Sequence, residues 1–320
     1  MYVVSEDAVR KIVDEKMAYD AIAKAFIAAH KGTGKVFPVV HAKGCDGING
    51  FSMKSGNLSD LQLSGLKVGS HWPQNHQLHG VPNHGTTTLL LDEKTGFPYA
   101  VLNAGYLNGL RTAAANAVAT NNLVRKGAHV LGVIGAGHQA IFEIKAICKI
   151  RDIDKILIHS RNAKTVDHAI EELAKDGVAA EHCEVETLCR NADVLVTVTG
   201  ARGPLFDAEW IKPGTHVSAM GADQPGKQEL PVGLLEQASL YADYPPQSII
   251  NGEFEAIYNK NNAVKITAIG AVLTDDAAGR TDEDQITVFD SSGIGLQDLS
   301  VAKAVLDQAI TKNLVSDVEF

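Results

Sequence analysis

The sequence has neither a long apolar run nor a surplus of basic residues. No window reaches the ~18 continuous apolar residues that a membrane helix requires, and the opening stretch MYVVSEDAVRKIVDEK carries acids where a secretion signal has its apolar core. The net charge is −9 and the sequence pI about 5.7. A general basic surface for nucleic acid or anionic membrane is therefore missing, although a local basic pocket is compatible with this charge.

Paired cysteines are missing as well. The four cysteines form no C-x-x-C pair, and Cys183 and Cys189 are too isolated to indicate a zinc site. We therefore expect reduced thiols and a cytoplasmic protein that binds neither nucleic acid nor membrane. The 320 residues are 45% hydrophobic and 21% charged, which is ordinary for a globular protein with a real core and enough length for two domains.

The first 125 residues mix helical and strand patterns. Apolar residues at three-to-four spacing predict a helix from Glu6 to about Lys31. Strands are predicted over residues 36–41, 86–92 and 98–103, and the turn DEKTGFP makes the last two a hairpin. The alanine-rich residues 110–125 are predicted to form a helix that leaves this region.

A different rhythm begins at His129, where short apolar strands alternate with helical stretches. The predicted strands are HVLGVIG, KILIHS (155–160), ADVLVTVTG (192–200), THVSAMG (215–221), SLYADY (239–244) and ITVFDSSG (286–293), with helices over 138–150 and 162–176. This alternation is typical of a parallel sheet with helical crossovers. A closing amphipathic helix is predicted over 296–312.

We therefore expect an α/β protein of two domains. Residues 1–120 would form an α+β substrate domain, joined by the C-terminal helix in 296–320, and residues 121–295 a Rossmann-type dinucleotide-binding domain.

The stretch GVIGAGHQA carries the sharpest local motif. Gly135, Gly137 and Ala140 fit G-x-G-x-x-G/A between a predicted strand and a predicted helix. The first glycine permits a tight turn, the second lets a pyrophosphate approach the backbone, and the third small residue lets helix and strand pack closely. The phosphates would lie at the helix N-terminus, where free N–H groups favour an anion. The cofactor contacts predicted from this stretch are Gly135, Ala136, Gly137, His138 and Gln139.

The end of the second strand bears on which cofactor binds. NAD-specific folds usually place Asp or Glu ~20 residues after the glycine motif, whereas this chain has His159, Ser160 and Arg161. Ser160 and Arg161 can bind a 2′-phosphate, which favours NADP(H). NAD(H) stays open, with Arg161 stacked on adenine or solvated.

Taken together, the motifs resemble the ornithine cyclodeaminase/μ-crystallin family over nearly the whole chain. The resemblance rests on GLKVGSHWPQN, LLLDEKTGFP, LRTAAANAVA, VIGAGHQA, MGADQPGKQEL and FDSSGIGLQDL, in the family's order. It implies a homodimer that associates through the N-terminal domains, a Rossmann domain in each subunit and an active site in the cleft between domains.

The resemblance also implies site residues. Lys67 matches a lysine near the substrate carboxylate, Arg111 the arginine that binds it, and Asp223 the acid near the reacting carbon. Thr112, Thr199, Met220, Ser292 and Gly293 complete the predicted cofactor contacts. An arginine fork suits an α-carboxylate, and such clamps hold the reacting carbon at attack distance. The alternatives stay open that Arg111 pairs within its own helix, that Lys67 is a surface lysine and that Asp223 is a turn residue.

Lys54 separates the possible reactions. Ornithine cyclodeaminases place an acid thirteen residues before the conserved lysine, where this sequence has Lys54. A cation there would repel ornithine and attract a second carboxylate. Together with W-P-x-N, GKQEL and GLQDL, it resembles the branch of the family that reduces iminosuccinate to L-aspartate. The proton would come from Lys67 or from a water ordered by Asp223.

Three other functions remain open. One is reduction of another imino acid, as in alanine dehydrogenase or a Δ1-pyrroline- or piperideine-2-carboxylate reductase. Another is a cyclodeaminase-type lyase, and the third is a crystallin-like NADPH-binding protein without catalysis.

The stretch KVGSHWPQNHQLHGVPNHG is rich in histidine. The spacing is irregular and broken by prolines and glycines, which argues against a metal site. We predict His71, Asn75 and His84, with His41 from FPVVH, as hydrogen-bonding walls of an acidic substrate's pocket. His76 and His79 are predicted to be solvated.

Overall fold

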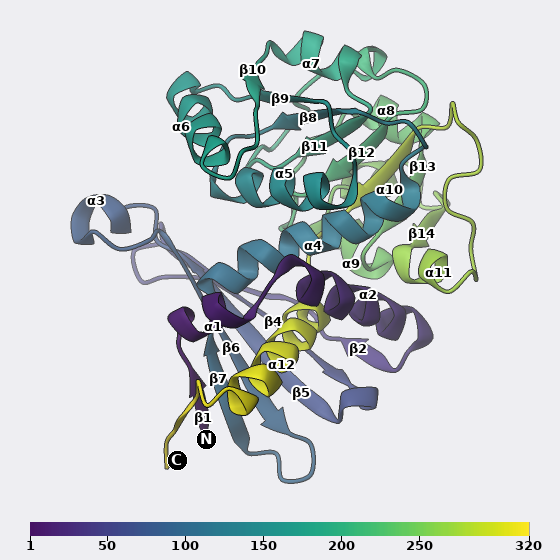
Figure 1. The fold of residues 1–320 in the computed structure, drawn as a ribbon. Coiled ribbons are helices and arrows are strands. Elements are labelled where there is room, and N and C mark those ends of the chain that lie inside the picture. The colour runs from purple at the N-terminus through teal and green to yellow at the C-terminus, as the bar shows by residue number, and fades with distance from the viewer. Residues whose placement is uncertain (320) are drawn as a thin grey trace. The chain divides into compact units, whose positions relative to one another are not determined.

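The computed structural model describes residues 1–319 and divides into two compact units (Figure 1). Unit 1 comprises Met1–Arg111 and Ile294–Phe320, and unit 2 comprises Thr112–Gly293. The expected boundary at residue 120 differs from the observed one because helix α4 (Gly105–Leu123) runs through it. From Thr112 on, the helix belongs to unit 2; Asn116 Nδ2, for example, donates to Glu143 Oε2 at 2.8 Å.

Unit 1 is built on an eight-stranded sheet with the order β16-β1-β7-β6-β5-β4-β2, with β3 also paired to β4. The strands are β1 (Tyr2–Val4), β2 (Gly34–Val36), β3 (Val40–Lys43), β4 (Gly50–Leu58), β5 (Leu63–His71), β6 (His84–Asp92), β7 (Pro98–Asn103) and β16 (Ser316–Asp317). The helices are α1 (Glu6–Ile12), α2 (Glu15–Lys31), α3 (Asn75–His79) and α12 (Gly295–Thr311). Figure 1 shows α12 beside α2 and across the sheet. The β6–β7 hairpin and the C-terminal helix are confirmed.

The helix predicted from Glu6 to Lys31 is two helices. Val13 is extended, and Asp14 starts the second helix by accepting a hydrogen bond from Met17 N at 2.7 Å. An N-cap carboxylate satisfies a free N–H of the first turn. The strand predicted over 36–41 is likewise split into β2 and β3, with Pro38, which lacks an N–H donor, between them.

Two strands that carry predicted site residues, β4 and β5, were not predicted from the sequence. Their sequences, GFSMKSGNL and LSGLKVGSH, are polar and glycine-rich. The glycines are needed because neighbouring strands and α12 both approach them closely. A Cβ added at Gly56 would lie 2.5 Å from Lys35 O of β2, and one at Gly65 would clash with Leu89 O of β6; Leu296 and Leu299 of α12 are the next nearest neighbours. Close approach of other backbone segments and of a helix therefore explains the glycines in these strands.

Unit 2 has the predicted Rossmann-type sheet, with the order β10-β9-β8-β11-β12-β15-β13-β14 and parallel pairing throughout. The strands are β8 (Val130–Ile134), β9 (Lys155–His159), β10 (Glu181–His182), β11 (Val194–Thr197), β12 (His216–Ala219), β13 (Ser239–Ala242), β14 (Ile266–Ala268) and β15 (Thr287–Asp290). The helices are α5 (His138–Ile150), α6 (Ala163–Ala174), α7 (Val185–Asn191), α8 (Val232–Gln237), α9 (Pro245–Asn251), α10 (Glu255–Lys260) and α11 (Ile269–Leu273). The strand order reverses between β8 and β11, which is where such sheets bind their ligands.

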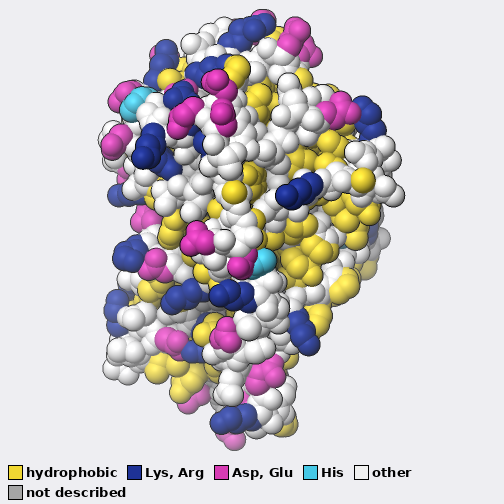
Figure 2. All heavy atoms as spheres, turned by 90° about the vertical axis from the view of Figure 1, so that its right-hand side faces the viewer, with side chains coloured by type: hydrophobic (Ala, Val, Ile, Leu, Met, Phe, Trp, Pro, Cys, Tyr) yellow, Lys and Arg dark blue, Asp and Glu magenta, His cyan; other side chains and the backbone are white. Residues whose placement is uncertain are grey.

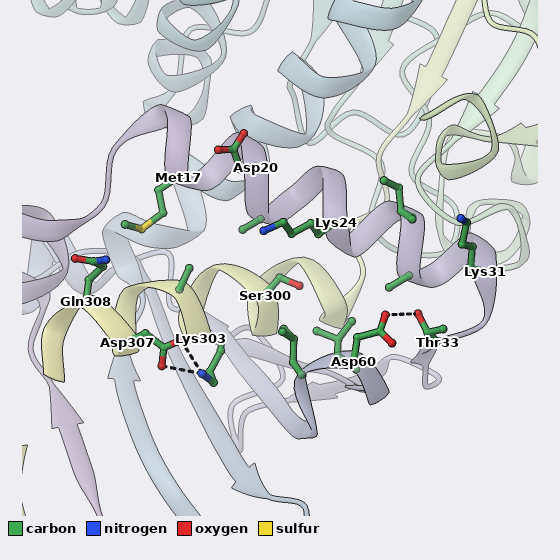
Figure 3. A pocket seen from close by; sticks show the side chains of 16 residues that line it. Met17, Asp20, Lys24, Lys31, Thr33, Asp60, Ser300, Lys303, Asp307 and Gln308 are labelled. Carbon is green, nitrogen blue, oxygen red and sulfur yellow. Dashed lines mark hydrogen bonds and ion pairs between the residues drawn. The ribbon is translucent and has the colours of Figure 1, made fainter. Parts of the chain in front are cut away.

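The structure contains no membrane-spanning helix among residues 1–319 and no segregated basic face in the view of Figure 2. Among residues 1–319, none of the helices has the combination of length and apolar character needed to cross a bilayer. On the face drawn in Figure 2, basic and acidic side chains are interspersed. A groove of about 600 Å³ lies between α2 and α12 (Figure 3), and its lining includes none of the predicted site residues.

Candidate active site

A pair of buried lysines lies at the centre of the sheet of unit 1. The register of β4 and β5 sets Lys54 directly opposite Lys67, and Lys67 faces Thr88 of β6. Opposed residues share a face of the sheet, with Cβ atoms about 5 Å apart. Each lysine is only 5% exposed. Because like charges placed opposite one another destabilise a sheet, this arrangement requires compensation from outside the strands.

The compensation comes from α4 and from the start of α12. Asp298 Oδ1 of α12 lies 2.9 Å from Arg111 Nε and 3.3 Å from Lys67 Nζ. Asn108 Oδ1, one turn before Arg111, accepts from Lys67 Nζ at 3.0 Å and from Arg111 Nη2 at 2.7 Å. Lys67, Arg111 and Asp298 are all buried. Lys67 and Arg111 are therefore not surface residues: both contact the same acid, Asp298, and Lys54 lies beside Lys67 on the sheet.

Arg111 keeps donors available for a ligand. Its Nη1 donates to Gln297 Oε1 at 2.9 Å and its Nη2 to Asn108. Each terminal nitrogen carries two N–H groups, so these contacts within residues 1–319 use one on each and leave the other for a ligand. Two such donors are enough for a bidentate pair with a carboxylate.

The pKa of Lys67 is lowered to near neutral pH. Burial, followed by the nearby charge of Arg111 and then that of Lys54, lowers the pKa of Lys67 from 10.5 to about 7, against the opposing effect of Asp298. A lysine with this pKa can both hold and release a proton near pH 7. Such perturbed groups are typical of functional sites.

The predicted histidines lie on the same face of the sheet but at different distances. His41 pairs with Ser52, which is two residues from Lys54 on β4. His71 and His84 face each other four residues beyond Lys67, which is roughly 13 Å along the strand. Their rings stack at 4.3 Å, and both are exposed.

The remaining residues of the histidine-rich stretch form a loop. Asn75 Nδ2 donates to Pro82 O at 3.2 Å, and His76 N donates to Asn83 Oδ1 at 2.8 Å, so these contacts close the loop around α3. Within residues 1–319, no three His, Cys, Asp or Glu side chains gather as a metal ion would require.

Sequence reasoning missed Asn108, Gln297 and Asp298. The available signal was an acid within the apolar pattern of the predicted C-terminal helix, since a buried acid needs a partner; the structure shows that Gly295 to Ala302 are all buried. The partners, however, are more than 180 residues away along the chain, as the Arg111–Gln297 contact shows.

In unit 2, the turn between β8 and α5 has the shape that the glycine motif requires. Gly135 has φ +117°, and a Cβ there would lie 2.6 Å from Val198 O. Gly137 is the N-cap of α5 and has open space at the Cβ position, while Ala136 and Ala140 are buried. His138 and Gln139 begin the helix, and the N–H groups of a first helical turn can bind a pyrophosphate. These residues fit a dinucleotide.

Strand β9 ends without a carboxylate. Gly135 N donates to His159 O at 2.8 Å, which ties the glycine turn to this end of the sheet. Ser160 follows with partial exposure and Arg161 is exposed. Ser160 Oγ accepts from Thr165 Oγ1 at 3.3 Å.

Buried acids brace the carboxyl ends of the neighbouring strands. Glu229 accepts from Thr199 N at 2.6 Å, from Thr199 and Thr197 hydroxyls, and from Gly221 N beside Met220. Asp243 accepts from Gly293 N at 2.7 Å and from Ser292 Oγ at 3.3 Å. Thr199, Met220, Ser292 and Gly293 were predicted from the sequence as cofactor contacts, but these acids were not singled out.

Two further acids lie behind them. Glu253 accepts from the backbone N–H groups of Glu229 and Leu230, and Asp290 accepts from Glu253 N at 3.1 Å. Burial raises the pKa of Glu229, and it raises the pKa values of Glu253 and Asp290 well above their usual range. These carboxyls support the loops at the carboxyl ends of the strands, where the dinucleotide is predicted to bind.

Asp223 lies in the loop after β12. Its Oδ1 pairs with Lys227 Nζ at 2.6 Å, and Lys227 also donates to Gly221 O at 3.2 Å. The Asp223 side chain is 43% exposed. Thr112 follows Arg111 on α4 as the first residue of unit 2.

The chain is similar to known proteins along its whole length. Residues 2–313 match the model of the ornithine cyclodeaminase/mu-crystallin family. The chain is 36% identical to the iminosuccinate reductase of Paracoccus denitrificans, over 100% of both chains. It is 34% identical to the alanine dehydrogenase of Archaeoglobus fulgidus, over 99% of this chain and 98% of that protein.

Solved structures agree with these matches. The Paracoccus denitrificans iminosuccinate reductase, in complex with NAD+, has a TM-score of 0.93 at 35% identity and covers 100% of this chain and 99% of its own. An archaeal alanine dehydrogenase dimer with bound NAD has a TM-score of 0.92 at 33% identity, with coverage of 100% and 99%. The Δ1-pyrroline-2-carboxylate reductase of Thermococcus litoralis, with NADH and L-proline, has a TM-score of 0.92 at 26% identity, with coverage of 99% and 100%.

Proposed function

Because this chain belongs to the ornithine cyclodeaminase/mu-crystallin family, we propose that it reduces iminosuccinate to L-aspartate with a nicotinamide cofactor. The observation that carries the proposal is the buried group of three cations, Lys54, Lys67 and Arg111. Arg111 and Lys67 bind the α-carboxylate, and Lys54 binds the β-carboxylate. The relative with the same activity, 36% identical over the full length, supports this assignment.

The reaction adds a hydride to the imine carbon and a proton to the imine nitrogen. A bound nicotinamide supplies the hydride. Arg111 and Lys67 fix the carboxylate next to the reacting carbon, which restricts the substrate to one orientation. The proton comes from Lys67, whose pKa of about 7 suits a general acid, or from a water on Asp223.

The decisive experiment compares two substrates. NAD(P)H oxidation with oxaloacetate plus ammonia is expected to be much faster than with pyruvate plus ammonia. The second candidate, formation of alanine, is favoured by the 34% identical alanine dehydrogenase and predicts the reverse order. Release of ammonia from ornithine without net change in the cofactor would instead indicate a cyclodeaminase, and the absence of any turnover a binding protein.

Lys54→Met is expected to weaken oxaloacetate use selectively. Losing one charge-assisted contact costs about 1.5–3 kcal/mol, or roughly 10–150-fold in kcat/KM. The activity with pyruvate, which lacks the second carboxylate, should hardly change. Lys43→Met, an exposed lysine on neighbouring β3, serves as the matched control. An equal loss with both substrates would contradict the role of Lys54.

Asp223→Asn is expected to lower kcat while leaving the Kd of the cofactor nearly unchanged. The amide keeps the size of the side chain but cannot order a proton-donating water in the same way, and such acid–base roles contribute about 10²–10⁴-fold. Stopped-flow turnover and cofactor fluorescence titration measure the two quantities. Unchanged turnover would remove Asp223 from the chemistry and leave its pairing with Lys227 as its function.

We infer that NADP(H) is the favoured cofactor, because the end of β9 offers Ser160 and Arg161 and no carboxylate. The NAD and NADH in relatives' structures support the alternative, NAD(H). Arg161→Ala is expected to raise the KM for NADPH by about tenfold, as one lost charge-assisted contact would, with little effect on the KM for NADH. A lower KM for NADH than for NADPH in the unchanged protein would overturn this preference.

We further propose a cytoplasmic homodimer. Four free cysteines are consistent with a reducing compartment. The sheet face of unit 1 opposite Lys54 carries Met53, Leu66, Val68 and Leu89, none of them fully buried. Pairing of this face with a second copy would cover it, as the dimeric relative suggests. A sedimentation mass equal to one chain would contradict the dimer.

A further inference from the structure

Asp298 and Asn108 occupy equivalent positions between the same two cations. Each presents one oxygen to both Lys67 and Arg111, at distances of 3.3 and 2.9 Å for Asp298 Oδ1 and of 3.0 and 2.7 Å for Asn108 Oδ1. Two cations are thus joined by two bridging oxygens, of which only the Asp298 oxygen carries a negative charge. The two bridging residues come from different helices, α12 and α4.

We propose that Asp298 is a positioning residue, the counter-ion that holds Lys67 and Arg111 side by side so that both can bind the substrate carboxylate. Its consequence for turnover rests on the proposed imine reduction, but its effect on Lys67 is a property of the protein alone. Asp298 touches neither the reacting carbon nor the imine nitrogen in this role. It acts through the two cations that bind the substrate.

The charges around Lys67 support this role. Lys54 faces it from β4, Arg111 from α4 and Asp298 from α12, and Asn108 is neutral. Asp298 is thus the one anion in this set from unit 1. Since burial and both cations disfavour the charged lysine, loss of Asp298 should make Lys67 release its proton at a still lower pH.

Because the two bridging positions are nearly equivalent, the negative charge can be moved from one to the other by substitution. Asp298→Asn removes the anion and should lower the pH at which Lys67 titrates by about 1–3 units. Asn108→Asp adds a second anion and should raise it by a similar amount. The double variant, which moves the charge from one bridge to the other, should return the titration to within about half a unit of the original protein.

Lys67 is observed directly by NMR in protein labelled with ¹³C at lysine Cε, with Lys67→Arg identifying its resonance. Asp307→Asn is the matched control, because Asp307 lies on the same helix and pairs with Lys303 at 2.6 Å in the groove of Figure 3. It should leave the titration of Lys67 unchanged. A single Asp298→Asn variant that fails to fold would still leave Asn108→Asp and the double variant to report the shift.

Enzyme kinetics give the second measurement. In aspartate oxidation Lys67 must be unprotonated to accept the released proton. We therefore expect kcat/KM to decrease at pH values below the pKa of Lys67. That acidic limb should move with the NMR titration in each variant. Opposite shifts and rescue in the double variant would establish the role, whereas shifts of the same sign or none would overturn it. If the NMR shifts appear but no imine is reduced, the proposed function fails and the counter-ion assignment stands.

Discussion

Lys67→Met is expected to lower kcat/KM for imine reduction by about 10²–10⁴-fold, the range of a lost general acid. Lys67 shares Asn108 with Arg111 and has a pKa of about 7, so in the proposed mechanism its removal takes away both a carboxylate ligand and a proton donor. Methionine fills similar space without a charge. Steady-state kinetics with oxaloacetate plus ammonia measure the loss.

Lys67→Arg separates the two roles of this residue. Arginine keeps the positive charge but stays protonated at all accessible pH values. If Lys67 donates the proton, the arginine variant should be nearly as slow as the methionine variant. Recovery of most activity in Lys67→Arg would assign Lys67 to carboxylate binding alone and leave the proton to the water on Asp223.

Lys67→Met should also change how the free energy of unfolding depends on pH. The pKa of Lys67 in the folded chain is about 7, against 10.5 for a free lysine. Between these values the unfolded chain holds a proton that the folded chain has released, so this residue makes the free energy of unfolding rise with pH. Lys67→Met should lose that rise in urea denaturation between about pH 7 and 10. An unchanged slope would show that Lys67 does not titrate in this range.

Arg111→Lys is expected to lower kcat/KM by about 10²-fold or more, mainly through a higher KM. A lysine cannot form the bidentate pair, and two charge-assisted hydrogen bonds contribute about 1.5–3 kcal/mol each. The change also removes the contact with Gln297 and shortens the reach toward Asp298. Arg10→Lys, at an exposed arginine that pairs with Glu6, is the control and should have no kinetic effect.

Arg111→Met tests how much the fold depends on this site. It leaves Asp298 with Lys67 as its cation, and breaking a buried ion pair costs about 3–5 kcal/mol. We expect a clearly lower melting temperature in addition to the loss of activity. A fully active Arg111→Met variant would exclude Arg111 from substrate binding, whatever its stability.

Local patterns in the sequence were enough for the cofactor unit. The glycine motif, the helix over 138–150 and the alternation of apolar strands with helices all reappear in the structure. Each depends on neighbours in the chain: a turn that only glycine permits, a period of 3.6 residues, a run of buried strand residues. Such features are encoded in short segments of the sequence, so they can be predicted without knowledge of the tertiary structure.

The arrangement of side chains in the proposed substrate site could not be predicted from short windows. Lys54 and Lys67 were identified as separate cations, but their pairing depends on the register of β4 and β5, two strands that lack the usual β pattern. A shift of one residue would place one of them on the opposite face. Nothing in a short window determines that register, because it depends on pairing with other strands and on packing against a helix from the far end of the chain.

The sequence by itself determined a dinucleotide-binding α/β fold, its family, and the identity of the cations Lys54, Lys67 and Arg111. Only the tertiary structure decided that these cations lie together, that Asp298 and Asn108 bridge two of them, and that burial brings the pKa of Lys67 to about 7. The reason is physical. Charges interact through space, and the strength of that interaction depends on burial and on contacts between residues far apart in the chain.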